Sequence, residues 1–427
     1  MGKIARIPLG LRILAGLLLG LLVGIVLPPA GAAAWSDNFV AVARTGGQLW
    51  LSALQMTVLP LVFALLALGL GRPSKTTAGG GLIARRATLV FAALYAFSLV
   101  VAVSLNALLL AIWPVSPSTI EAFKKFAGTS VEAKIPPPGE IILGLVPSNV
   151  FASLAAGSIL PVVVFAILFG LGMRHIAERS QERVAELVEA ISDIMFMIVR
   201  WILELAPVGA FGLVVATAHE TGVAMLWGLA TYLRHLLIVV AVMLALAYPV
   251  AALWGRTGFW RFAKGAAPSQ LVAASTQSSV GSLPVMLEST RTLGVSDDVS
   301  NVTLPLAVSV FRFSGPTYTL TVAAYAAAAA GLSPDLNSLA LASLPALLME
   351  FAAVGLPNQV SFIAVAAPAF AVLGAPLGFL PVMLAVDTIP DIVGTTANVT
   401  GDLAAATVVA GRAERSETPA SAVLSTA

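Results

Sequence analysis

Six apolar runs, each long enough to cross a lipid bilayer, occupy the first 254 residues of this chain. They cover approximately residues 9–27, 48–70, 88–113, 141–173, 184–218 and 226–254. A membrane-crossing helix needs about 20 mostly apolar residues, so the longer runs require tilt or a break. The composition agrees, because 59% of the residues are apolar and 10% are charged, whereas a soluble domain has about 25% charged residues. The sequence therefore predicts an all-α, polytopic membrane protein.

The composition also excludes several functions. The 23 Lys and Arg and the 21 Asp and Glu leave a net charge of +2, which is too little for a nucleic-acid-binding surface. The sequence has no Cys, and its three His lie far apart, so neither a thiolate nor a His-built metal centre is expected. It contains no phosphate-binding loop motif and no recognisable Ser/His/Asp constellation. We expect neither an enzyme nor a resident cofactor.

Two further spans, near residues 301–332 and 378–410, bring the expected total to eight. Short cytoplasmic loops are rich in Lys and Arg. Such residues cluster at the N-terminus and after every second helix: Lys3, Arg6 and Arg12, then within residues 72–86, 174–183 and 256–264. This alternation predicts a multi-pass protein of the cell (inner) membrane with cytoplasmic N- and C-termini. Residues 411–427 are polar enough to form a disordered cytoplasmic tail.

Two interrupted segments predict re-entrant hairpins. Residues 267–290 are too rich in Ser, Thr and Gln to cross lipid. Residues 337–373 are cut at 355–359 into halves of about 14 to 17 residues, each short of a full span. Broken helices at membrane depth line transporter binding sites, where helix ends offer N–H groups to anions and C=O groups to cations. Poorly packed or interfacial segments are the alternative interpretation.

Polar residues form one stripe on the last predicted helix. At 100° per residue, four of them fall within about 60° of one another: Asp387, Asp391, Asn398 and Asp402. Thr395 borders the stripe on one side and Gly394 on the other, where the missing side chain leaves space. Carboxylates at membrane depth are costly unless they are hydrated, paired or protonated. We expect a cavity that receives cations or amines; carboxylates held by neighbouring helices for packing alone are the alternative.

Arg312 is a further charge at membrane depth. It follows Phe311 in a run whose Gly315 and Pro316 predict a break near the middle of the seventh helix. A buried guanidinium needs an anion. The candidates are Glu350 in the second hairpin, the stripe carboxylates and a carboxylate of the substrate, and the sequence does not choose among them.

Five segments, in order along the chain, resemble one known family. They are residues 54–63 (LQMTVLPLVF), 146–172 (VPSNVFASLAAGSILPVVVFAILFGLG), 189–212 (EAISDIMFMIVRWILELAPVGAFG), 278–284 (SSVGSLP) and 398–402 (NVTGD). They resemble the second, fourth and fifth helices, the tip of the first hairpin and the last helix of the dicarboxylate/amino acid:cation symporters, which include glutamate transporters. The resemblance extends over nearly the whole chain.

The resemblance implies a glutamate-transporter-like elevator fold with eight transmembrane helices and two re-entrant helical hairpins, assembled as a homotrimer. Residues 1–266 would then form mainly the scaffold and trimerisation helices 1–6, with helices 3 and 6 associated with the transport domain. Residues 267–410 would form the transport core, which consists of hairpin 1, helix 7, hairpin 2 and helix 8.

Matching positions also imply site residues. The substrate contacts would be Ser278 and Ser279 for a carboxylate, Val354 and Gly355 at the gate tip, Asp391 for an amino group, and Thr395 and Asn398. Asn398 with Asp402 matches part of a sodium site. Tyr95 and Ser98 resemble positions around another sodium site.

Two positions depart from the family pattern. Acidic-substrate members carry an Arg where this chain has Gly394. The family motif N-M-D-G-T aligns with residues 311–315 (FRFSG), which removes an Asn and an Asp that help to hold sodium. One hypothesis joins both changes: Arg312 supplies a fixed positive charge in place of a mobile cation or of the missing Arg.

The predicted function is that of a symporter, a secondary active transporter of a small amino acid or dicarboxylate, coupled to H⁺ in preference to Na⁺. Arg312 and Gly394 join the predicted substrate site, and Glu350, Asp387 and Asp391 are the candidates for proton coupling. A sodium-coupled neutral amino acid transporter, an anion channel and a substrate sensor on the same scaffold are the alternatives.

Overall fold

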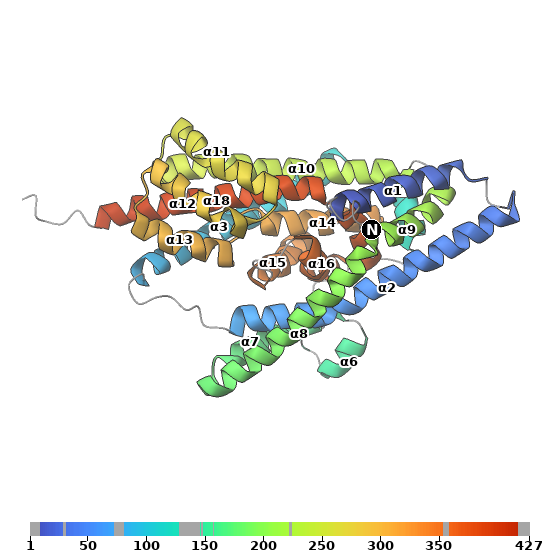
Figure 1. Cartoon of the computed structure of the whole chain (residues 1–427), viewed down its shortest axis with the longest axis horizontal. Helices are drawn as coiled ribbons and strands as arrows, with labels where there is room; N and C mark the ends of the chain where they lie inside the picture. The colour runs from blue at the N-terminus through green and yellow to red at the C-terminus, as the bar shows by residue number, and fades with distance from the viewer. Residues whose placement is uncertain are drawn as a thin grey trace, which may run out of the picture. The chain divides into compact units, whose positions relative to one another are not determined.

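The structure is a computed structural model that describes residues 9–28, 31–71, 81–127, 146, 148–156, 158–221, 224–352 and 358–416. These residues are mostly helical and include no strand (Figure 1). Within them, four helices are long and apolar enough to cross a membrane: Ala34–Leu68, Leu82–Ile112, Leu226–Trp254 and Thr388–Gly411. A helix satisfies its backbone polar groups internally, as lipid requires. The all-helical prediction is confirmed, and the apolar helices agree with an integral membrane protein.

The helices group into two compact units. Unit 1 comprises Met1–Pro73, Ala102–Leu237 and Thr319–Pro390, and unit 2 comprises Ser74–Val101, Ile238–Tyr318 and Asp391–Ala427. Four helices belong partly to each unit: α3 (Gly81–Ile112), α10 (Ala224–Pro249), α14 (Gly315–Ala329) and α18 (Thr388–Ser416). The functional division at residue 266, between scaffold and transport core, stays a prediction.

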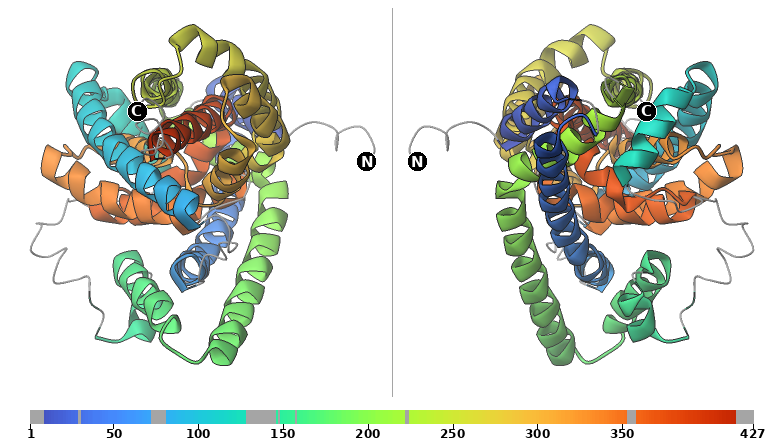
Figure 2. Two further views of the ribbon diagram at one scale, coloured as in Figure 1. Left: turned by 90° about the vertical axis from the view of Figure 1, so that its left-hand side faces the viewer. Right: turned by 90° about the vertical axis from the view of Figure 1, so that its right-hand side faces the viewer.

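Unit 1 holds most of the remaining helices. They are α1 (Leu9–Val26), α2 (Ala34–Gly71), α4 (Pro117–Ala127), α6 (Val150–Ala155), α7 (Ile159–Met173), α8 (Glu178–Glu204), α9 (Ala206–Thr221), α15 (Leu336–Ala352), α16 (Asn358–Leu373), the 3₁₀ turn η3 (Leu377–Phe379) and α17 (Leu380–Ala385). α2 packs on α7, α8 and α9. α7 and α8 diverge from the short connection at residues 174–177 (Figure 2).

Glycines set the packing of α1 against α9 in unit 1. Gly16, Gly20 and Gly24 recur every fourth residue, and a Cβ atom at any of them would collide with a backbone oxygen of α9. Small residues at this spacing let membrane helices approach closely, because no side chain separates the two backbones. The spacing of the glycines in α1 therefore allows this helix to pack closely on α9.

Unit 2 adds the π-helical turn η2 (Val250–Trp254), α11 (Phe259–Thr276), α12 (Ser279–Leu293) and α13 (Asp297–Val310). α11 packs on α12, and in unit 1 α15 packs on α16. Both segments predicted to be hairpins are thus helical pairs. The first pair is longer than the predicted 267–290 and turns at Gln277, whose left-handed φ of 53° ends α11. That either pair is re-entrant stays a prediction.

The predicted break of the seventh helix is confirmed, because α13 ends at Val310 and α14 begins at Gly315. Another predicted span is divided, since residues 184–218 become α8 and α9, bent by 56°. Pro207, which has no N–H for the hydrogen-bond ladder, lies in the first turn of α9.

The last helix begins later than predicted. α18 starts at Thr388 instead of residue 378, after η3, α17 and a turn at Val386 and Asp387. Pro390 suits this start, because the first-turn N–H groups of a helix need no partner within it. The predicted place of Asp387 on the helical stripe is therefore wrong, whereas Asp391, Asn398 and Asp402 do share one continuous helix. α18 continues to Ser416, into the segment predicted as a tail.

Candidate functional site

Two features stabilise the carboxylate of Asp391, the first acidic residue of α18. Asp391 lies in the first turn of the helix, where the N-terminal end of the helix dipole favours a negative charge. Its Oδ1 accepts a hydrogen bond from Thr395 Oγ1 at 3.3 Å. The residue is 6% exposed, so a small part of it remains open to a ligand.

Ser314, in the break between α13 and α14, forms hydrogen bonds to α18. The Ser314 N–H donates to Asn398 Oδ1 at 2.8 Å. The Ser314 hydroxyl lies 2.9 Å from the same oxygen and 3.1 Å from Gly394 O, and can donate to either one. The amide oxygen of Asn398 is therefore already engaged within unit 2.

Arg312 stands in the same break and is half-buried. Its backbone N–H donates to Tyr95 Oη at 2.9 Å, and Tyr95 in turn donates to Val310 O at 3.1 Å. The guanidinium acts electrostatically on both Asp391 and Asp402. Of the anions that the sequence left open for Arg312, two stripe carboxylates are thus within its electrostatic range.

Asp402 is the second of these carboxylates. It is fully buried, and neither of its oxygens has a hydrogen-bond partner in the described part of the chain. A buried carboxylate without donors is stable only if a cation or a proton neutralises it. Asp402 therefore needs either the charge of Arg312 or a bound proton, whereas Asp391 also has a hydrogen bond and the helix N-terminus.

Aromatic rings surround the break. Phe311 stacks on Phe91 with ring centroids 4.6 Å apart, and the edge of Tyr95 meets Phe311 at 5.0 Å. Phe313 is fully buried beside Gly401, where a Cβ atom would collide with the Phe313 side chain. Phe311 and Phe313, the neighbours of Arg312 in the chain, thus offer no side-chain oxygen to a metal ion.

The space expected beside Gly394 is occupied. A Cβ atom at Gly394 would lie 3.2 Å from two ring carbons of Tyr318, which is closer than nearly all real Cβ contacts. The prediction of open space at this position is therefore wrong, because the Tyr318 ring fills it.

The tip of the first helical pair also lies in unit 2. Ser278 caps α12, and its Oγ accepts a hydrogen bond from the Gly281 N–H at 3.0 Å. Ser278 and Ser279 are half-buried at the N-terminus of this helix. The first N–H groups of a helix are suited to an anion, as the predicted contact with a carboxylate requires.

Ser98 lies in unit 2, where its hydroxyl is 2.8 Å from that of Thr317, and the remaining predicted residues belong to unit 1 or lie outside the described residues. Glu350 is 2% exposed, and its Oε1 accepts a hydrogen bond from Thr319 Oγ1 at 2.9 Å. Asp387 is fully buried and acts electrostatically on Tyr232. Val354 and Gly355, the predicted gate tip, lie outside the described residues.

Nearly the whole chain, residues 9–412, matches a known protein family. The chain belongs to the sodium:dicarboxylate symporter family. A C4-dicarboxylate transport protein of Solibacter usitatus (strain Ellin6076) is 28% identical over 412 residues, which are 93% of this chain and 90% of the relative. The proton/sodium-glutamate symport protein of Geobacillus stearothermophilus is 25% identical over 418 residues, or 95% of this chain and 94% of the relative. The proton/glutamate-aspartate symporter of Escherichia coli (strain K12) is 31% identical over 272 residues, which are 63% of this chain and 61% of the relative.

The predicted family is therefore confirmed, and the family and these relatives are symporters, not enzymes. Phe311 and Phe313, which the resemblance aligns with an Asn and an Asp of the family motif, have no side-chain oxygen. The donors predicted for a residual sodium site are one amide oxygen that Ser314 already engages and the Asp402 carboxylate beside Arg312. Among the described residues, no group of three or more His, Asp and Glu could hold a metal ion.

Two residues of the site escaped the sequence analysis. Ser314 and Tyr318 each contact α18 across a gap of more than 70 positions in the chain. No local pattern marks them, although Ser314 lies next to the charged break and Tyr318 lies one turn after it. A list of all polar or aromatic residues within two turns of Arg312 would have included both.

Proposed function

We propose that this protein is a secondary active transporter that carries a small dicarboxylate or amino acid together with a proton. Its family and relatives support cation-coupled transport. One observation carries the choice of ion: the charge of Arg312, in a break lined by aromatic rings, acts electrostatically on Asp391 and Asp402. A fixed guanidinium there supplies the positive charge that a sodium ion supplies in a site made of carboxylates and carbonyls.

The proton would be carried by a buried carboxyl group. Asp391, Asp387 and Glu350 are the candidates, because each is at least nine-tenths buried. A carboxyl group at membrane depth is stable when it is protonated or paired with a cation, so its protonation can follow substrate binding and release. A sodium ion bound by Asn398 and Asp402 is the alternative.

For the substrate, a dicarboxylate is favoured over a neutral amino acid. Arg312 already provides a positive charge beside Asp391, which reduces the need for a substrate ammonium group at that carboxylate. The same guanidinium and the N-terminus of α12 at Ser278 and Ser279 suit two carboxylates. The C4-dicarboxylate transport protein among the relatives is consistent with this choice.

The finer architecture follows from the same family. We propose eight transmembrane helices, two re-entrant hairpins, a homotrimer and a gate at Val354 and Gly355. In the elevator motion, residues 267–410 and the associated helices 3 and 6 would move against the other helices of residues 1–266. Both termini would be cytoplasmic, with the protein in the inner membrane. Because the chain has no Cys, single cysteines introduced at Ser118 and Ser421 can test this topology. A membrane-impermeant thiol reagent applied outside intact cells should label S118C and spare S421C; the reverse pattern would contradict the proposal.

Uptake into liposomes tests the coupling ion. The purified protein is reconstituted, and uptake of a labelled C4-dicarboxylate, aspartate or a neutral amino acid is measured under a proton gradient or a sodium gradient, each imposed separately. We expect the proton gradient alone to drive dicarboxylate uptake. Uptake that requires sodium would overturn the proton proposal, current without coupled uptake would favour the anion channel, and saturable binding without flux would favour the sensor.

The variant R312M sharpens this test, because it removes the fixed charge while keeping an apolar side chain of similar length. We expect it to abolish proton-driven uptake. The matched control is R291M, which changes an exposed Arg of the same unit that pairs with Glu288 and Asp297. Equal uptake by both variants would contradict a role for Arg312.

A further inference from the structure

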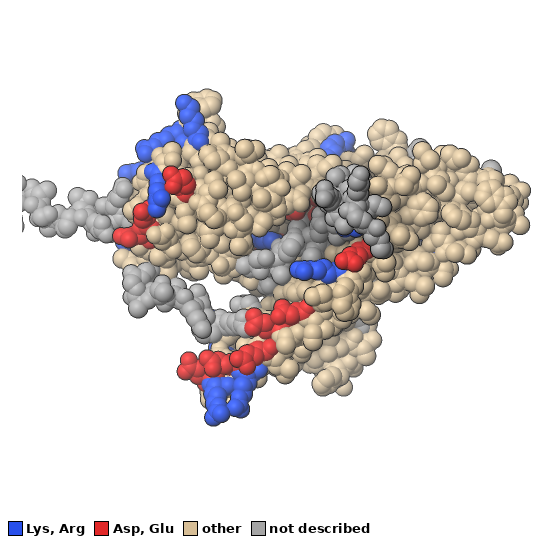
Figure 3. Space-filling view, viewed as in Figure 1, with Lys and Arg blue, Asp and Glu red and all other residues tan. Residues whose placement is uncertain are grey.

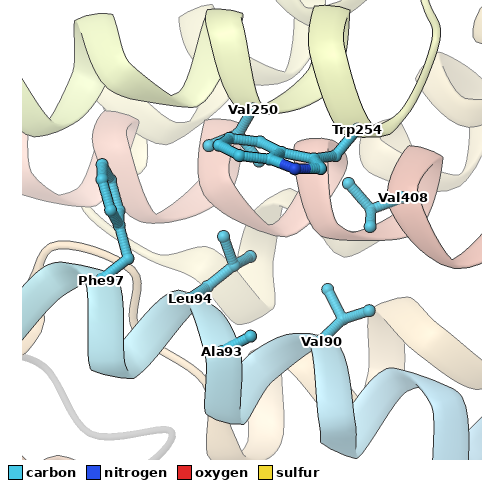
Figure 4. Close-up of a pocket in the computed structure, with 7 residues that line it drawn as sticks. All are labelled: Val90, Ala93, Leu94, Phe97, Val250, Trp254 and Val408. Carbon is cyan, nitrogen blue, oxygen red and sulfur yellow. The ribbon is translucent and has the colours of Figure 1, made fainter.

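Unit 2 contains an apolar cavity away from the residues of the candidate site. It has a volume of about 260 Å³ and is lined by Val90, Ala93, Leu94, Phe97, Val250, Trp254 and Val408 (Figure 4). The side chains of α3 face Val250 and Trp254 across this space, and Val408 of α18 closes one side. Ala93 and Trp254 are themselves exposed, so the cavity opens at the surface of the unit. Apart from the indole N–H of Trp254, the side chains that line it are hydrocarbon and offer contacts for a hydrocarbon chain.

The π-helical turn shapes one wall of this cavity. η2 widens the last turn of the α10 segment, and Gly255 behind it lies so close to Thr407 that a Cβ atom would collide with Thr407 Oγ1. Single π-turns within helices frequently mark functional sites. Here the turn holds Trp254 beside α18 with 58% of its surface exposed.

Exposed aromatic residues continue past the turn. Phe259 is 48% exposed and Trp260 is 75% exposed. Trp and other amphipathic rings gather at the level of the lipid headgroups. The open side of the cavity therefore lies near a membrane interface.

Positive charge is concentrated beside the same opening. Arg256 is exposed two residues after Trp254, and Arg261 and Lys264 follow on α11. Figure 3 shows Lys and Arg side chains gathered over the start of α11. On α3, Arg86 lies one helical turn before Val90, on the same face of the helix. A ligand whose hydrocarbon chain enters the cavity would place its polar end among these cations.

We propose that the cavity binds one acyl chain of an anionic phospholipid, whose phosphate lies against Arg256. The apolar lining suits a hydrocarbon chain, and the exposed aromatic residues set the opening at the depth of the lipid headgroups. The adjacent Lys and Arg side chains suit a negatively charged headgroup. Basic pockets between transmembrane helices are the usual form of a specific lipid site. The site depends on the protein being membrane-embedded and not on its substrate or its coupling ion.

Quenching of Trp254 fluorescence tests this proposal. The full-length protein is reconstituted in phosphatidylcholine vesicles that contain a minor fraction of phosphatidylglycerol or phosphatidylcholine with brominated acyl chains, because bromine quenches indole on contact. The chain has seven Trp, so the contribution of Trp254 is the difference between the wild type and W254F. We expect brominated phosphatidylglycerol to quench this contribution at about fivefold lower mole fraction than brominated phosphatidylcholine, from about 1 kcal/mol per Arg.

Three variants make the result decisive. R256Q should remove the preference for phosphatidylglycerol, and A93F should reduce quenching by both lipids because the new ring fills the cavity. R291Q, at an exposed Arg of the same unit, should leave the preference unchanged. Equal quenching by the two lipids in the wild type would mean ordinary surrounding lipid and would overturn the proposal. So would a preference that R256Q leaves intact. Size-exclusion elution of each variant reports whether it is folded.

Discussion

The two ends of the stripe on α18 differ in how each carboxylate is supported. Asp391, in the first turn, has the Thr395 hydroxyl, the helix N-terminus and Arg312. Asp402, three turns later, has the charge of Arg312 and no hydrogen-bond donor among the described residues. The charge of Arg312 thus acts both on Asp391, which also has a hydrogen bond and the helix N-terminus, and on Asp402, which has neither.

This difference indicates two roles for one guanidinium. At Asp391 the local support allows the Arg312 charge to be shared with a ligand, because the carboxylate keeps its other partners. At Asp402 the charge supports stability whenever the carboxyl group is ionised, because a buried carboxylate without a cation is strongly destabilising. Arg312 therefore connects the stability of unit 2 with the chemistry that we propose for the site.

The largest expected effect comes from R312M. Removing the cation leaves a proton as the remaining means of neutralising the buried Asp402, so the free energy of unfolding should fall by at most about 3–5 kcal/mol. Thermal or denaturant unfolding in detergent measures the loss. R291M, an exposed ion-pair control with 58% of its side chain accessible, should cost far less, because water and salt screen an exposed pair. An equal loss in the two variants would remove the distinction between the carboxylates.

The double variant R312M/D402N tests which carboxylate is responsible for that loss. Most of the stability should return, because the neutral amide removes the unpaired charge. R312M/D391N should restore much less, since Asp391 has other support. Equal rescue by the two double variants would mean that both carboxylates depend on Arg312 to the same degree.

Gly394, between the two carboxylates, is expected to show the next largest effect. G394A places a Cβ atom 3.2 Å from the Tyr318 ring, and such overpacking costs about 1–3 kcal/mol. Gly46 is the control, because it lies inside α2 with no atom within 4 Å of the added Cβ. G46A should stabilise the protein by up to about 1 kcal/mol through helix propensity. If G394A and G46A change the free energy of unfolding in the same direction, the Tyr318 ring moves aside at little cost.

A smaller change in stability is expected for D391N. Asn keeps an oxygen for the Thr395 hydroxyl, and Arg312 keeps Asp402, so the free energy of unfolding should change by about 1 kcal/mol or less. Substrate uptake in liposomes should nevertheless be lost, because the carboxylate charge is gone. Retained uptake with reduced stability would reverse the roles that we assign to the two ends of the stripe.

The smallest effect concerns a carboxylate outside the membrane-spanning segments. The backbone N–H and hydroxyl of Ser338 lower the pKa of Asp335 below its ordinary value of 3.8. Because the folded-state pKa is depressed, this contribution is present above that value and is lost as the pH falls through the folded pKa. D335N should therefore lower the melting temperature slightly at neutral pH and make no difference in strong acid. If D335N lowers the melting temperature equally at every pH, the shape of the Asp335 side chain, and not its charge, stabilises the fold.

Much of the fold could be predicted because its signals are local. Run length and polarity predicted the helices, Gly315 and Pro316 predicted the break at residues 311–314, and Ser-rich or Pro-containing segments predicted the two helical pairs. The start of α18 and the bend at Leu205 were missed, although Pro390 and Pro207 are the residues that accompany them. A proline within an apolar run is compatible with either a kink or a helix start, so composition alone could not choose.

The sequence by itself determined that the chain is an all-helical membrane protein of the sodium:dicarboxylate symporter family, and that the charged Arg312 stands beside a break in a predicted helix. These properties reside in the identity of single residues and in short contiguous segments. Only the tertiary structure decided that the Arg312 charge acts on Asp391 and Asp402, that Ser314 engages Asn398, and that Tyr318 fills the space at Gly394. Each of these contacts joins residues more than 70 positions apart, and their meeting depends on how whole helices pack.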